Sequence, residues 1–144
     1  MPYSTNDANS ILGWTFAKNS ITNKNRVYIG LSSNDPEADK GVFNELSGDG
    51  YARELIAQYG EAYPAKMGTP SNRQIKNAGQ INWTKFTAQK VVKGIGLFTE
   101  PTGGTPYAYF SLSNTSVTVP AGAVALFDPE TFILALSNTD EAIT

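Results

Sequence analysis

The spacing of the apolar residues divides the chain into a short helical stretch and a longer series of β-strands. In NDANSILGWTFAK, Ile11, Leu12 and Phe16 fall at helical spacing, and Asn6 can cap the first turn. This pattern predicts one short helix over residues 5–18. Because a helix of this length gains little stability alone, its apolar face needs a partner in the folded protein.

Beyond the polar linker KNSITNKN, apolar residues recur with a period of two. In RVYIGLS, Val27, Ile29 and Leu31 point to one side, which predicts a strand with one buried face. The run VVKGIGLF has apolar residues on both sides and predicts a central strand covered on both faces, with glycines that allow close packing. The turn-rich stretch EPTGGTP then predicts a hairpin. Five further runs are expected to form strands: YARELIA, PYAYFSL, SVTVPAG, AVALFD and TFILALS.

Short strands separated by glycine and proline, after one leading helix, define the expected fold class. They predict a mainly β protein, an antiparallel β-sandwich of jelly-roll-like form with one short N-terminal helix. A chain of 144 residues suits a single domain over 1–144, with the helix at 5–18 and the sandwich at 26–137. We expect seven residues to be buried: Val27, Ile29, Leu31, Ile95, Leu97, Phe110 and Leu134.

Two missing residue types remove most catalytic chemistry. The chain has no cysteine and no histidine, so disulfides, cysteine and histidine metal sites, a thiol nucleophile and a Ser-His-Asp triad are excluded. The eleven lysines and arginines are scattered, and the formal net charge is -2. A dedicated nucleic-acid-binding protein needs a basic patch, so we expect no nucleic-acid partner.

The hydropathy of the chain and its first residues indicate where in the cell the protein is made and whether it enters a membrane. No apolar run approaches the roughly 20 residues that a membrane helix requires. The opening MPYSTNDANS lacks the basic start and the apolar stretch of a signal peptide. We therefore expect a soluble protein without membrane insertion, made in the cytoplasm.

The stretch ELSGDGYAREL combines two glycines, an aromatic residue and an arginine in eleven residues. A glycine-rich loop could cradle a phosphate, but the third glycine of a dinucleotide-binding fingerprint is missing and no strand-turn-helix follows. The favoured interpretation is a structural turn in which Gly48 and Gly50 have positive φ and Tyr51 leads into a strand. Arg53 would tie this turn to a carboxylate or to backbone carbonyls.

Acidic residues suggest a metal site and a catalytic pair, and the sequence supports neither strongly. Asp35, Glu37 and Asp39 alternate as in calcium loops, but Lys40 and Leu46 stand where such a loop needs glycine and a bidentate acid. We predict a solvated surface loop without metal. Paired carboxylates could hydrolyse glycosides, yet every acid lies in a polar or turn-like stretch. We therefore expect no catalytic residue and no cofactor.

Aromatic residues have two plausible uses in a β-sandwich. Their rings could form a platform for sugars, or they could fill the core or a subunit interface, where tyrosine and tryptophan bury large areas. The candidates for a sugar platform are Tyr28, Tyr59, Tyr63, Trp83, Tyr107 and Tyr109. The candidate interface residues are Trp14, Phe16, Tyr107 and Tyr109.

Five longer stretches follow one another in a characteristic order: VYIGLSSNDP, ELSGDGYARE, IKNAGQINWTKFTA, VKGIGLFTEPTGGTPYAYFSL and VTVPAGAVALFDPETFILAL. Their most specific parts are Gly-Tyr-Ala-Arg at residues 50–53, Gly-Leu-Phe with a Thr-Gly-Gly turn at 96–104, and Val-Pro-Ala-Gly at 119–122. With this ordered set the chain resembles a widespread family of small bacteriophage and prophage tail fibre proteins. The resemblance covers nearly the whole chain, including the leading helix.

The resemblance implies a virion structural protein without enzymatic activity, made in the cytoplasm of a bacterial host. It implies other virion proteins of the tail, portal or capsid as partners, and symmetric copies of such proteins commonly form homo-oligomers. A tail fibre, a head fibre and a capsid decoration are the open positions in the virion. Two other functions also stay open: a carbohydrate-binding module with a host-surface glycan as partner, and an enzyme with paired carboxylates.

Overall fold

The computed structural model describes residues 26–58, 66–72, 74–112 and 116–135. These residues form ten β-strands and no helix, so none of them belongs to a helix able to cross a membrane. The described part is therefore mainly β, as the spacing of the apolar residues predicts. The helix expected at 5–18 lies outside the described residues.

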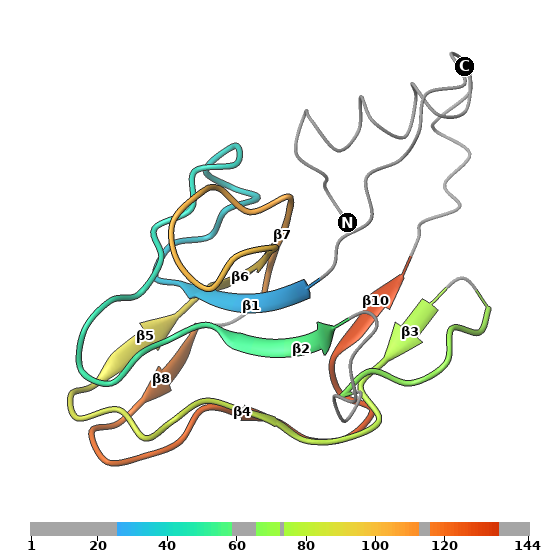
Figure 1. The fold of residues 1–144 in the computed structure, drawn as a ribbon. Helices are drawn as coiled ribbons and strands as arrows, with labels where there is room; N and C mark the ends of the chain where they lie inside the picture. Colours follow the sequence, from blue (N-terminus) through green and yellow to red (C-terminus); the bar gives the residue numbers. More distant parts are fainter. Residues whose placement is uncertain (1–25, 59–65, 73, 113–115, 136–144) are drawn as a thin grey trace.

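Every strand pairing is antiparallel. The strands are β1 (Arg26–Ser32), β2 (Glu54–Gln58), β3 (Gln74–Lys76), β4 (Ile81–Asn82), β5 (Lys90–Val92), β6 (Gly94–Phe98), β7 (Ala108–Ser111), β8 (Val117–Val119), β9 (Leu126–Phe127) and β10 (Ile133–Ala135). Four of them form one sheet in the order β2-β1-β6-β7 (Figure 1). The predicted hairpin is confirmed, because β6 and β7 pair on either side of the EPTGGTP turn.

The other six strands form one long, interrupted ribbon of two antiparallel segments. Ile75 pairs with Leu134 at one end of the ribbon, and Val91 pairs with Thr118 at the other end. Both segments contain the same number of residues between these two pairs, as expected for two strands that run alongside each other. Between the three strand pairs, further backbone hydrogen bonds join the two segments. The amide of Trp83, for example, donates to a carbonyl of the opposite segment at 3.0 Å. Figure 1 shows the two segments side by side from β5 and β8 to β3 and β10.

The ribbon continues directly into the sheet at Lys93. The Lys93 amide donates to Ser32 O at 2.8 Å, and its carbonyl accepts from Leu112 N at 3.0 Å. The expectation of a single strand over VVKGIGLF is therefore wrong, since the run forms β5 and β6 with different partners. The bend falls at Lys93, an exposed residue between Val92 and Gly94, and alternation alone does not distinguish an exposed position within one strand from a change of partner strand. β6 alone is the predicted central strand, because it lies between β1 and β7 and all its residues are buried.

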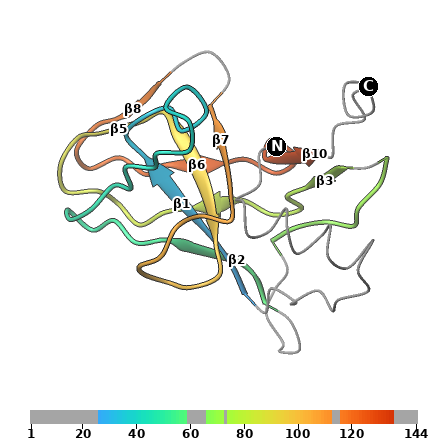
Figure 2. The ribbon, with the colours of Figure 1, turned by 90° about the horizontal axis from the view of Figure 1, so that it is seen from above.

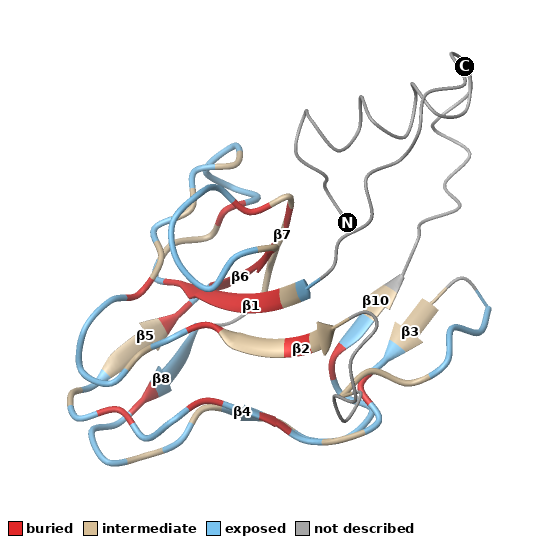
Figure 3. Ribbon diagram, in the orientation of Figure 1, coloured by how far each residue is buried: buried red, intermediate tan, exposed pale blue. Residues whose placement is uncertain are grey.

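The apolar core joins the sheet to the ribbon. Figure 3 shows buried residues along β1 and β6 of the sheet and further buried positions along β4 of the ribbon. Together these residues agree with the predicted antiparallel β class, while the jelly-roll-like sandwich stays a prediction. The buried cluster consists of Ile29, Leu31, Leu46, Ile56, Ile81, Trp83, Phe86, Val92, Ile95, Leu97, Ala108, Val119 and Phe132.

Burial of the expected core residues follows their place in the sheet. Inner positions of β1 and β6 are buried, whereas positions nearer the edges of the fold are only partly buried and pack against the core. The buried ones are Ile29, Leu31, Ile95 and Leu97. The partly buried ones are Val27, Phe110 and Leu134.

β1 is buried on both faces, so the expected strand with one buried face is wrong. Ser32 is fully buried and Tyr28 is 8% exposed, although both alternate with Leu31 along the strand. The segment of residues 33–53 returns along β1, with the Leu46 amide donating to Leu31 O at 2.9 Å. A strand pattern cannot reveal this cover, because the covering segment is an irregular loop. Figure 2 shows β1 and β6 crossing the middle of the molecule.

Asn77 is a buried polar residue that organises the end of the ribbon near β10. Its side-chain nitrogen donates to Gly79 O at 2.8 Å and to Asp128 O at 2.9 Å. Its side-chain oxygen accepts from Phe132 N at 2.9 Å. These bonds satisfy the buried amide and hold residues 128–132 against the opposite segment.

Candidate functional site

The double-glycine turn is a stretch of left-handed backbone that contacts the ribbon. Gly48, Asp49 and Gly50 have φ angles of 69°, 56° and 88°, a region that glycine occupies at little cost. Thr84 Oγ1 donates to Gly50 O at 2.7 Å, and the Thr87 amide donates to Asp49 O at 3.0 Å. A Cβ at Gly50 would lie 3.0 Å from a ribbon carbonyl, so this close contact also requires glycine.

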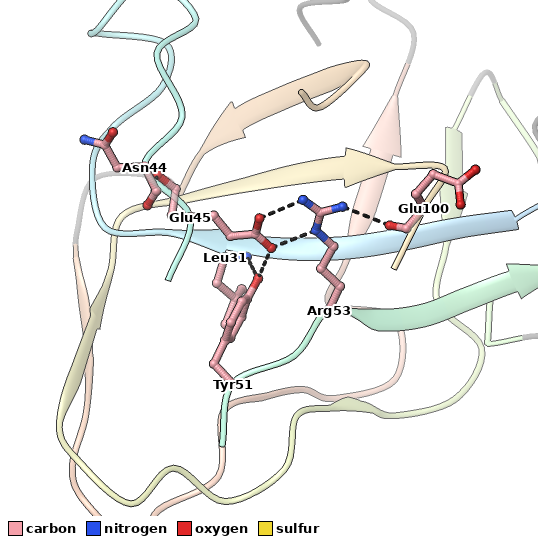
Figure 4. Close-up of polar contacts among 7 residues, drawn as sticks. Leu31, Asn44, Glu45, Tyr51, Arg53 and Glu100 are labelled. Carbon is pink, nitrogen blue, oxygen red and sulfur yellow. Dashed lines mark hydrogen bonds and ion pairs between the residues drawn. The ribbon is translucent and has the colours of Figure 1, made fainter. Parts of the chain in front are cut away.

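Arg53, immediately before β2, is a buried cation whose three guanidinium nitrogens all donate hydrogen bonds (Figure 4). Its Nε and one terminal nitrogen donate to the two carboxylate oxygens of Glu45, both at 2.7 Å. Its other terminal nitrogen donates to Glu100 O at 2.9 Å. The side chain of Arg53 is 2% exposed. The guanidinium carbon also lies 3.4 Å from the centroid of the Phe98 ring, where the ring face attracts a cation.

Tyr51 joins the same group from the end of the turn. Its hydroxyl donates to Glu45 Oε1 at 2.8 Å and accepts from Leu31 N at 2.9 Å. Burial raises the pKa of Tyr51 far above its ordinary value, and the bond to the Glu45 carboxylate acts in the same direction. Tyr51 therefore stays neutral and acts as a hydrogen-bonding link between the turn and β1.

A glycine in β1 makes room for this group of side chains. A Cβ at Gly30 would lie 2.7 Å from the Phe98 ring and 3.2 Å from both the Glu45 carboxylate and the Tyr51 hydroxyl. The side chains therefore pack directly on the backbone of β1. We call the five residues Gly30, Glu45, Tyr51, Arg53 and Phe98 the Arg53 cluster.

The Arg53 cluster is closed to ligands. The three guanidinium nitrogens of Arg53 all donate to atoms of the same chain, and a phosphate would have to displace Glu45 from a buried ion pair. Such a displacement is costly, because it leaves a charge buried without a partner. The cluster instead joins three segments: the double-glycine turn, the loop before it and the end of β6. The partners of Arg53, the Glu45 carboxylate and the Glu100 backbone carbonyl, are of the two kinds that the sequence predicts.

The acidic loop after β1 is attached to the edge strand β7. Asp35 accepts hydrogen bonds from two backbone amides of its own loop, both at 3.0 Å, and from the Ser111 hydroxyl. Glu37 accepts from Ser111 N at 2.8 Å, and Asp39 accepts from the Asn34 side chain at 2.7 Å. Among the described residues, no group of three or more carboxylates could hold a metal ion. Asp35 and Glu37 therefore attach the loop to β7, whereas Asp39 binds within the loop, and the calcium-loop alternative gains no support from this geometry.

Acid should weaken this attachment. The hydrogen bond from Ala38 N, followed by the one from Ser111, lowers the pKa of Asp35 below its ordinary value of 3.8. A carboxyl group with a lowered pKa in the folded state stabilises the protein above its ordinary pKa, and this contribution is lost as the pH falls through the lowered value. We expect the free energy of unfolding, measured by denaturant titration, to fall below about pH 4 and to fall less steeply in Asp35→Asn.

A second variant separates the effect of the hydrogen bond from that of the charge. Ser111→Ala removes the hydroxyl donor and keeps Asp35, so it should also reduce the loss of stability in acid. Equal acid slopes in the wild type and in Asp35→Asn would show that Asp35 does not hold the loop.

Within the part of the chain that the structure describes, the aromatic candidates do not form an exposed platform. Tyr28 is 8% exposed and Trp83 is 2% exposed, so neither offers a ring face to a sugar. Tyr107 and Tyr109 are half-buried, in and just before β7, and their role at an interface stays a prediction. The remaining candidates lie outside the described residues: Tyr59, Tyr63, Trp14 and Phe16.

An apolar cavity of about 270 Å³ lies where the ribbon meets the sheet. It is lined by core residues such as Leu31 and Trp83 and by ribbon residues that include three exposed large apolar side chains, Val117, Val124 and Leu126. Sequence reasoning missed this cavity, because its walls come from segments far apart in the chain. The one signal available in the sequence is a long run without charged residues around β8 and β9.

Comparison with protein families agrees with the resemblance that the ordered stretches show. A family model described as "Podophage GP4 fiber I protein gp80" matches residues 2–135. The match therefore includes every described strand. No curated individual protein matches the chain.

Proposed function

Because the chain belongs to the podophage GP4 fiber I protein gp80 family, we propose that it is a non-enzymatic structural component of a phage fibre that works through contacts with other virion proteins. The observation that carries this proposal is the extent of the family match, over residues 2–135. A fibre protein is part of the virion, so the virion is where the protein acts. Its synthesis in the cytoplasm of the bacterial host is part of the same proposal.

The polar groups of the described residues support a role without catalysis. Arg53, Glu45 and Tyr51 bind one another and the backbone of the same chain. Asp35 and Glu37 bind the edge of β7. A catalytic group must reach a substrate, whereas these side chains are used to hold segments of the protein together.

The proposed partners are other virion proteins of the tail, portal or capsid, together with further copies of this chain. The family description favours a fibre over a capsid decoration. A carbohydrate-binding role is less favoured, because Tyr28 and Trp83 are buried. We also infer that the sheet and the ribbon are the two layers of a jelly-roll-like sandwich, which the core shared by both supports.

Localisation in phage particles tests this function. We expect an antibody against the protein to label fibres in electron micrographs, and deletion of its gene to remove fibre density from otherwise intact particles. Particles from the deletion mutant serve as the control for unspecific labelling. Label on the head surface would support the decoration alternative instead. Complete particles that never contain the protein would rule out a virion component.

A further inference from the structure

Trp83 carries a buried hydrogen-bond donor without a partner. The residue follows β4 in the ribbon and is 2% exposed. Its backbone amide donates to Ala125 O at 3.0 Å, and its ring packs against the Phe127 ring, with 6.0 Å between the ring centroids. The indole Nε1 is the one buried side-chain nitrogen or oxygen among the described residues that has no hydrogen-bond partner. An indole N–H can only donate, and a buried donor without an acceptor destabilises the fold, so this group is available to a ligand.

Trp83 also forms part of the wall of the apolar cavity between the ribbon and the sheet. The volume of this cavity, about 270 Å³, exceeds the roughly 150 Å³ of an apolar cavity that binds benzene. The cavity reaches the protein surface, because its lining includes exposed side chains such as Val124 and Leu126. A molecule with one aromatic ring and a small substituent therefore has room and a route of entry.

The side chains of the wall define the polarity of the ligand. None of the lining residues is charged, and only Thr118 and Trp83 have polar side-chain groups. A charged molecule would lose its hydration there without gaining an opposite charge. A wholly apolar molecule would leave the indole N–H without an acceptor. The wall therefore matches an uncharged apolar molecule with one acceptor, since ligand sites usually combine apolar walls with a few polar groups.

We infer that this cavity binds a small uncharged molecule with an apolar body and one acceptor oxygen, and that Trp83 Nε1 donates a hydrogen bond to this oxygen. The apolar body fills the space between the ribbon and the sheet, where its burial stabilises the complex. The oxygen satisfies the buried indole donor, which gives selectivity over a molecule of the same shape without an acceptor. The inference is independent of the proposed structural function, because this site needs no other virion protein.

Three probes of nearly the same shape test the class of ligand. Acetophenone has the acceptor, α-methylstyrene has a methylene group in place of the oxygen, and benzoate carries a charge. We expect acetophenone to shift the Trp83 indole N–H resonance of the nitrogen-labelled full chain downfield in a saturable NMR titration. α-Methylstyrene should bind without this downfield shift, and benzoate should not bind. Trp14→Phe assigns the resonance, because it leaves Trp83 as the only tryptophan.

Variants separate the hydrogen bond from the shape of the cavity. Trp83→Phe removes the donor and keeps an aromatic ring, so the affinity for acetophenone relative to α-methylstyrene should fall about fivefold or more. Ala123 lines the cavity, and Ala123→Phe places a ring in it that should abolish binding of both probes. Ala38→Phe is the matched control: Ala38 is exposed and lies outside the cavity wall, so this variant should bind both probes as the wild type does.

Three results would overturn the inference: no saturable shift of the Trp83 resonance with acetophenone, an unchanged affinity ratio in Trp83→Phe, or undiminished binding in Ala123→Phe. Should Trp83→Phe not fold, the wild type still decides, because equal shifts with acetophenone and α-methylstyrene would show that the indole donates to no ligand oxygen. An indole resonance that exchanges magnetisation with bound water and does not respond to acetophenone would also overturn the inference, with water as the partner. Failure of the proposed function is distinguishable, since it would appear as a protein absent from phage particles, whatever the cavity binds.

Discussion

Replacement of Arg53 by alanine is expected to lower the free energy of unfolding by roughly 3 kcal/mol, the lower end of the range for breaking a buried ion pair. The substitution leaves the Glu45 carboxylate without its bidentate partner and Glu100 O without its donor. The side chain of Glu45 is 26% exposed, so water compensates part of this loss. Chemical denaturation of the purified variant measures the effect.

Two comparisons identify the source of this loss. In a double-mutant cycle, the combined change of Glu45→Ala and Arg53→Ala should cost clearly less than the two single changes added together, because both remove the same interaction. Lys90 Nζ lies 2.7 Å from Asp49 Oδ2 in a more exposed ion pair, so Lys90→Ala should cost much less than Arg53→Ala. Unchanged melting of Arg53→Ala would show that the arginine is not a structural anchor.

Replacement of Gly94 by alanine is expected to destabilise the protein by roughly 3 kcal/mol, the upper part of the range for overpacking. A Cβ at Gly94 would overlap Cδ of Pro36 and would lie 2.8 Å from its Cγ and 3.0 Å from Asn34 O. Pro36 is a buried, rigid ring, so it cannot turn away as a flexible side chain would. The measurement is the midpoint and slope of unfolding in denaturant.

Gly79→Ala is the matched control for this substitution. An added Cβ at Gly79 meets no atom within 4 Å, so it should leave the stability nearly unchanged or raise it slightly by restricting the unfolded chain. If Gly94→Ala and Gly79→Ala had equal stability, the close approach of the acidic loop to β6 would not be a constraint on the fold.

Local patterns predicted most of the strands and the character of the double-glycine turn. The alternation in RVYIGLS and YARELIA corresponds to β1 and β2, and the turn in EPTGGTP corresponds to the hairpin of β6 and β7. Each of these signals is contained within a few residues, so it can be read before the fold is known. β3 and β4 were missed, because each contains only one apolar residue and so shows no alternation.

The family could also be predicted from the sequence, because the order of ELSGDGYARE and the other stretches along the chain can be recognised without knowing which residues are in contact. The match to residues 2–135 confirms this prediction. The partners of Arg53 could be predicted only by kind. Glu100 is far from Arg53 in the chain, and only the return of β6 beside β1 brings its carbonyl within reach.

The sequence by itself determined the β class, the antiparallel hairpin and the family, because periodicity, turn residues and ordered motifs are local properties of the chain. Only the tertiary structure decided that β1 is covered on both faces, that VVKGIGLF divides between ribbon and sheet at Lys93, and that an uncharged segment borders an apolar cavity. The physical reason is that burial depends on which distant segment covers a residue. An alternating pattern reports the two faces of a strand but not the identity of the segment that packs on each.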